Sequence, residues 1–98
     1  MPLDSNTARI IDNAANRLGE LTAIAEERLA GAYADAAISA VDAIAAIDDT
    51  TDGATIATRL TNAADNIELM LRLAGTRITE AQRKQWQYDS DECRAWTP

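Results

Sequence analysis

Residues 33–47 read YADAAISAVDAIAAI, and this stretch decides the fold. Its polar side chains are Asp35, Ser39 and Asp42, whose spacings of four and three place them in one narrow stripe on a helix. The rest of that helix is apolar, and a helix of this kind must be covered on most sides. We therefore predict that neighbouring helices or a second copy of the chain enclose its apolar side chains. The side chains that this prediction concerns are Ile38, Val41 and Ile44.

Apolar residues also recur every three or four positions before and after this stretch, which is typical of amphipathic helices. The hydrophobic fraction of the 98 residues is 47%, much of it alanine, and phenylalanine is absent. We predict an all-α fold, a small alanine-rich bundle of three to four helices in a single domain over residues 1–98. The predicted helices span about residues 5–30, 33–47, 53–74 and 80–88, followed by a C-terminal tail at 89–98.

The connection between the first two helices depends on Gly31, which either ends one helix or interrupts a helix that continues to Ile47. A continuous helix over the 43 residues from 5 to 47 would be a rod of about 64 Å. A rod of that length suits an extended hairpin or an oligomer. We favour a break or kink near Gly31, although the sequence is compatible with both.

Local signals mark several helix ends. Asp4 or Ser5 can cap the first helix, because a short side-chain oxygen accepts a hydrogen bond from an amide of the first turn. Gly75 is the usual stop for the third helix. Thr79 and Gln82 have the spacing of a capping box, which predicts a short final helix.

Residues 48–53 read DDTTDG, which resembles the first half of a calcium-binding loop. A loop of that kind starting at Asp48 needs a bidentate glutamate at its twelfth position, where this chain has Arg59. We therefore expect a helix connection rather than a calcium site. In this interpretation the first two aspartates close one helix, and Thr51 or Asp52 caps the next.

Side chains that support common catalytic mechanisms are missing from the sequence. There is no histidine, so histidine-based triads, metal sites and acid–base pairs are excluded. Cys93 has no histidine to activate it, and Lys84 does not follow a phosphate-binding glycine loop. We therefore expect a protein that is not an enzyme and that has no metal and no cofactor.

The net charge restricts the classes of partner. With 16 acidic and 9 basic residues, the formal charge is -7. Repulsion from phosphates argues against conventional nucleic-acid binding and against anionic membranes, and favours a partner protein with a basic surface. No apolar run approaches the ~20 residues that cross a bilayer. The single cysteine and the lack of signal-peptide features lead us to expect a cytoplasmic protein.

The acidic residues are concentrated in the middle of the chain. No basic residue occurs between Arg28 and Arg59, whereas residues 59–98 contain six acidic and six basic residues. Asp35, Asp42 and Asp49 recur every seven residues. They would lie on one helix face, about 10 Å apart, if the helix extends that far. We interpret this face either as a solvated surface or as a docking stripe for a basic partner. The central aspartates are Asp35, Asp42, Asp48, Asp49 and Asp52.

Three of the four aromatic residues, Trp86, Tyr88 and Trp96, lie near the C-terminus. In one interpretation they fold back over Leu69 and Leu73, which add a second apolar patch to the third helix. In the other they form an exposed anchor, because tryptophan and tyrosine are enriched at binding hot spots. We include all three among the candidate partner-binding residues.

The chain resembles secreted helical-hairpin proteins of the WXG100 type in its length near one hundred residues, its alanine-rich helices and the placement of Tyr88 four residues before Glu92. That resemblance implies a hairpin that oligomerises. The Trp-x-Gly turn of those proteins is absent, and DDTTDG stands between the helices instead, so we do not assign the chain to them. In composition alone, the chain is similar to phage-encoded inhibitors of host defence such as anti-CRISPR proteins.

Three hypotheses of function follow. The first is a non-catalytic interaction module, a small acidic inhibitor or adaptor that docks on a basic surface and also self-associates, with a dimer favoured. The second is a structural or secreted hairpin that oligomerises. The third is a helical oligomer that binds a small ligand or nucleotide through the basic cluster of Arg77, Arg83 and Lys84.

Overall fold

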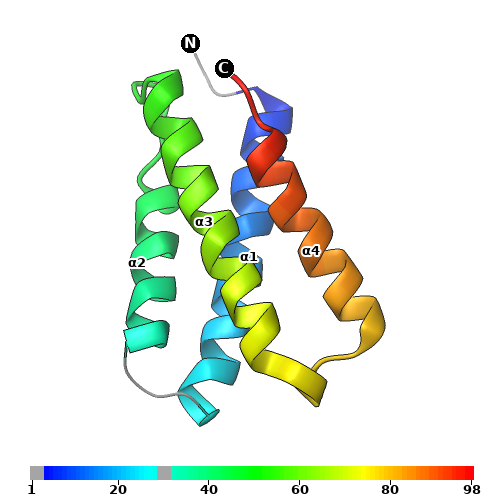
Figure 1. The fold of residues 1–98 in the computed structure, drawn as a ribbon. Coiled ribbons are helices and arrows are strands. Elements are labelled where there is room, and N and C mark those ends of the chain that lie inside the picture. The colour runs from blue at the N-terminus through cyan, green and yellow to red at the C-terminus, as the bar shows by residue number, and fades with distance from the viewer. Residues whose placement is uncertain (1–3, 29–31) are drawn as a thin grey trace.

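The computed structural model describes the backbone of residues 4–28 and 32–98, and the side chains of these residues except 24–28, 32–33 and 76. The described chain forms four α-helices and one short 3₁₀ helix, and the predicted all-α bundle is confirmed. Successive helices run in opposite directions, so that the start of α1 and the end of α4 lie at the same end of the bundle (Figure 1). The elements are α1 (Ser5–Arg28), α2 (Ala32–Ala45), α3 (Gly53–Ala74), η1 (Gly75–Arg77) and α4 (Glu80–Ala95).

The bundle has two central and two flanking helices. Helices α1 and α3 contact each other, and each also contacts both α2 and α4. Helices α2 and α4 lie on opposite sides and make no contact with each other among the described residues (Figure 1). The principal extents of 42 × 27 × 15 Å describe a flattened molecule. Each flanking helix therefore has one face on the core and an outer face that no described helix covers.

The core is built from leucine and isoleucine on the central helices and from alanine on α2. Leu18 and Leu21 of α1 and Leu60 and Ile67 of α3 are fully buried. The buried face of α2 consists mostly of alanine, whose small side chain allows close approach of the helix backbones. Burial of each large aliphatic side chain stabilises the fold by about 1.5–3 kcal/mol. The residues that α2 buries are Ala34, Ala37, Ala40 and Ile44.

The prediction that α2 is covered on most sides holds at one of the three side chains named for it and fails at another. Ile44 is fully buried and Val41 is half-buried against the core, but Ile38 is 42% exposed. The reason is the position of α2 at an edge of the bundle, where only its alanine-rich face meets α1 and α3. The apolar character of its outer face comes mostly from alanines, whose exposure costs little.

The first two helices do not form the 64 Å rod considered from the sequence. Helices α1 and α2 lie side by side and point in opposite directions (Figure 1). The expected break or kink near Gly31 itself lies outside the described residues. Helix α2 ends at Ala45, two residues before the predicted end, in a turn where the amide of Ile47 donates to the carbonyl of Ile44 over 3.2 Å.

The predicted C-terminal tail at 89–98 is wrong over its first seven residues, because α4 continues to Ala95. The residues that follow position 88 are mainly polar. The structure buries two of those polar residues, Asp89 and Ser90, and gives each of them hydrogen-bond partners on other helices. Buried polar positions break the apolar periodicity from which a helix is usually recognised.

The predicted helix ends are confirmed at three places. The carboxylate of Asp4 accepts a hydrogen bond from the amide of Thr7 over 2.7 Å at the start of α1. Gly75, with φ of 56°, follows α3 in the left-handed region that favours glycine. At the start of α4, Thr79 and Gln82 form both hydrogen bonds of the capping box.

Replacing Thr79 by alanine is expected to lower the free energy of unfolding by about 1 kcal/mol, because the amide of Gln82 loses its acceptor. Urea denaturation followed by circular dichroism measures this change. The control is Thr79→Ser, which keeps the hydroxyl and should stay close to the wild type. A serine variant as unstable as the alanine variant would contradict the assigned role of the hydroxyl.

Candidate functional site

The five central aspartates gather at one edge of the molecule, on α2 and on the connection between α2 and α3. All five are exposed. The helix does not extend far enough for a line of three carboxylates, because α2 ends at Ala45 and Asp49 lies beyond it. Asp35 and Asp42 remain on α2, two turns and about 10.5 Å apart along the helix axis.

Two of these aspartates hold the connection between α2 and α3 in place. The Asp48 carboxylate accepts hydrogen bonds from the amide and hydroxyl of Thr50, at 2.8 and 2.6 Å. Asp52 caps α3 by accepting from the amide of Thr55 at 2.8 Å, as predicted for this position. These hydrogen bonds stabilise the charged form and hold the pKa of both carboxyls below the usual value. Their first role is therefore to shape the loop.

Arg59, which stands where a calcium loop would need a glutamate, contacts the backbone of α2. Arg59 Nη1 donates a hydrogen bond of 3.2 Å to the carbonyl of Ala43, so its guanidinium points toward the last turn of α2. A cation in this place favourably offsets the negative end of the α2 dipole. Among the side chains that the structure describes, no three of histidine, cysteine, aspartate or glutamate lie close enough to hold a metal ion.

The outer face of α2 combines one exposed apolar side chain with two exposed carboxylates. Residues at i, i+3 and i+7 share a helix face, which places Ile38 between Asp35 and Asp42. Among the side chains that the structure describes, neither carboxylate has an ion-pair or hydrogen-bond partner. We refer to Asp35, Ile38 and Asp42 as the α2 stripe.

The C-terminal aromatic residues are not one exposed anchor. Trp86 is only 3% exposed and lies in the core, so its inclusion among the partner-binding residues is wrong: its side chain is inaccessible. Trp96 is half-buried, and its Nε1 donates a hydrogen bond of 2.9 Å to the hydroxyl of Thr7. Tyr88 is 56% exposed on α4. Of the three, only Tyr88 presents most of its surface to solvent.

A buried ion pair joins α1 to α4, and the sequence analysis did not identify it. Arg17 Nε lies 2.6 Å from Asp89 Oδ2, and the Asp89 side chain is completely buried. Gln85 Nε2 is 3.3 Å from the other carboxylate oxygen of Asp89.

Within α4, the spacing of Trp86, Ser90 and Cys93 is that of one buried helix face, and this was the signal that could have extended the predicted helix.

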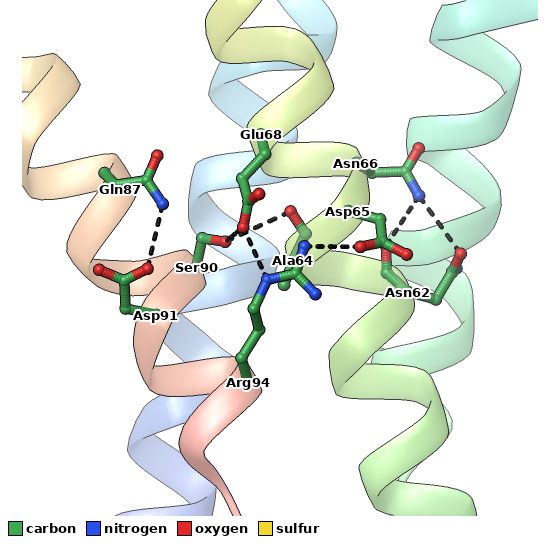
Figure 2. A network of polar contacts seen from close by, with 9 residues as sticks. All are labelled: Asn62, Ala64, Asp65, Asn66, Glu68, Gln87, Ser90, Asp91 and Arg94. Atoms are coloured by element: carbon green, nitrogen blue, oxygen red, sulfur yellow. Dashed lines mark hydrogen bonds and ion pairs between the residues drawn. The ribbon is translucent and has the colours of Figure 1, made fainter.

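A second polar network joins α3 to α4 (Figure 2). The hydroxyl of Ser90 donates to Glu68 Oε2 at 2.6 Å, and Arg94 Nε donates to the same oxygen at 2.8 Å. Arg94 Nη2 also lies 2.6 Å from Asp65 Oδ1. Arg94 and Ser90 together hold the pKa of Glu68 below the usual value. Ser90 is completely buried, whereas the Glu68 side chain is 31% exposed, and the pair serves as a structural contact between α3 and α4.

The predicted basic cluster is only partly available to a ligand. Arg83 donates a hydrogen bond of 2.9 Å to the carbonyl of Leu71 and a second one to the carbonyl of Gly75, so it caps the end of α3. Lys84 and Arg77 are exposed. The guanidinium of Arg83, one of the three residues of that cluster, therefore serves the connection between α3 and α4.

An open cleft of about 610 Å³ lies where the start of α1 meets the end of α4. Its wall includes Thr7, Ile10, Glu92 and Trp96. Of the predicted site residues it contains only Trp96, whose indole nitrogen is occupied by Thr7. The cleft and the α2 stripe lie on different helices.

The comparisons with protein-family models, curated proteins and solved structures gave no match to this chain. In the part of the chain that the structure describes, no helix has both the length and the apolar character needed to cross a bilayer.

Proposed function

We propose that the protein is a non-catalytic interaction module that binds a partner protein through the α2 stripe, as an inhibitor or adaptor. The observation that supports this proposal is an exposed isoleucine between two carboxylates for which no described side chain supplies a cation. An apolar anchor within a charged rim is the usual anatomy of a binding surface. The complementary surface is an apolar hollow flanked by lysine or arginine.

Charge complementarity favours a basic partner over a second copy of the chain. Two identical α2 stripes facing each other would bring like charges together, which costs free energy. Ordinary solution salt has opposite effects on the two assemblies, because it screens repulsion between copies and attraction to a basic partner. Self-association through α2 is the second candidate, since it would also cover Ile38.

The charge of the stripe is tested with Asp42→Lys. We expect this variant to bind at least about tenfold more weakly, because a like charge then faces the basic rim of the partner. The protein is immobilised, captured proteins are quantified by mass spectrometry, and the affinity of a purified captured protein is measured at two salt concentrations. Ile38→Ser tests the apolar anchor in the same assay.

The matched control is Asp91→Lys, which makes the same charge change at an exposed position of α4, on the opposite side of the bundle. A partner that binds the stripe is lost with Asp42→Lys and retained with Asp91→Lys. Equal retention by both variants, or equal loss, would overturn the proposal. Light scattering at low and high salt tests the second candidate, since a dimer formed through α2 would become more abundant as salt rises.

A further inference from the structure

Helix α4 differs from the other helices in how it is attached. Four ion pairs in the described part of the chain join α4 to the two central helices. Two connect it to α1 and two connect it to α3. The pairs are Arg9–Glu92, Arg17–Asp89, Arg94–Asp65 and Arg94–Glu68.

The apolar contribution of α4 to the core comes from two buried side chains, Trp86 and Cys93. Its buried residues are Trp86, Asp89, Ser90 and Cys93, of which two are polar. By contrast, eight of the nine buried residues of α3 are apolar. Helices α1, α2 and α3 contact one another in all three pairs, so they form a packed unit without α4. The attachment of α4 thus depends on polar contacts far more than the remaining bundle does.

We infer that α4 is a releasable helix, which separates from the α1–α2–α3 unit as one segment when its ionic contacts are weakened, while the other three helices stay packed. Proteins open in cooperative units of unequal stability, and a unit with few buried apolar side chains lies at the low end. Added salt screens the partly exposed pairs of Arg9 and Arg94. This opening is independent of the function proposed for α2.

Acid acts on the same contacts. Arg9 holds the pKa of Glu92 below the usual value, with a smaller contribution from Tyr88. Arg94 and Ser90, with a smaller contribution from Arg72, lower the pKa of Glu68. A carboxyl with a lowered pKa contributes stability that is present above its ordinary value near 4.5 and is lost as the pH falls through the folded-state pKa. Opening of α4 is therefore favoured by acid as well as by salt.

Cys93 provides a direct readout of this opening. It is the single cysteine of the chain and is only 2% exposed. Burial raises the pKa of its thiol to about 12, so almost no reactive thiolate exists while α4 is docked. Alkylation of Cys93 therefore requires α4 to move away from the core.

The test measures the rate at which iodoacetamide alkylates Cys93, by mass spectrometry, at constant pH and increasing salt. We expect the rate to rise about tenfold between 50 and 500 mM NaCl, because several ion pairs are screened together. Its urea dependence should be much weaker than that of global unfolding measured by circular dichroism, because only one helix is exposed. Native-state hydrogen exchange of the wild type should show weaker protection for α4 than for α1 and α3.

Two variants sharpen the test. Glu68→Gln removes the charge that Arg94 contacts and should accelerate alkylation at low salt. Asp12→Asn removes an exposed charge on α1 and should leave the rate unchanged. Alkylation that is insensitive to salt, or that has the same urea dependence as global unfolding, would overturn the inference. Equal hydrogen-exchange protection of α1, α3 and α4 would overturn it without any variant.

Discussion

Arg17→Met is expected to lower the free energy of unfolding by about 3 kcal/mol, since Asp89 would keep its buried carboxylate without a cation. Removing one partner of a buried pair typically costs 3–5 kcal/mol, and the partial exposure of Arg17 places this case at about the lower limit. Small domains have a total stability of about 5–15 kcal/mol, so the loss would be a large fraction. Urea denaturation followed by circular dichroism measures it.

The control is the double variant Arg17→Met/Asp89→Leu, which removes both charges together. Replacing a buried ion pair by apolar side chains of similar volume is often close to neutral, so the double variant should regain most of the stability. A double variant less stable than Arg17→Met would show that the pair itself, and not the unpaired carboxylate, dominates the energy. That result would contradict the expected order.

Trp86→Ala is expected to destabilise the protein by about 3–5 kcal/mol, because it removes a buried indole and leaves a cavity between α4 and the core. Thermal or urea unfolding measures the loss. Tyr88→Ala is the matched control two positions along the same helix, where the ring is 56% exposed. Its effect should be within about 0.5 kcal/mol.

This pair of variants separates the two roles considered for the C-terminal aromatic residues. A Trp86 variant as stable as the Tyr88 variant would contradict the buried position. The effects of the two variants on partner binding should not follow their effects on stability, because Trp86 is inaccessible in the folded protein. A folded Trp86→Ala protein that retains its partner would support the core role.

The third helix was the easiest to predict from the sequence. Its predicted bounds of 53–74 agree with those of α3 (Gly53–Ala74), because apolar periodicity and both end signals point to the same residues. Asp52 supplies the start and Gly75 the stop. The capping box at Thr79 fixed the start of α4 in the same way. Where propensity, patterning and end signals agree, the sequence alone predicts the element.

The predictions that failed concern residues whose environment depends on other helices. The length of α4 was missed because Asp89 and Ser90 are buried through partners on α1 and α3, which no local pattern reveals. The exposure of Ile38 depends on which helices flank α2. The sequence around Ile38 does not reveal which helices those are. Trp86 and Tyr88 are two residues apart, yet Trp86 is buried in the core and Tyr88 is exposed. This difference, too, depends on which face of α4 meets the other helices.

Both tryptophans of the chain belong to α4 or its C-terminal cap. Trp86 sits in the core, and Trp96 is tethered to Thr7 at the start of α1. Intrinsic tryptophan emission therefore reports whether α4 is docked on the bundle. Far-ultraviolet ellipticity, by contrast, averages over all the helices. Coincident curves would indicate all-or-none unfolding, and an emission change that comes first would reveal an intermediate. The natural chain thus contains its own optical reporter for the docking of its last helix.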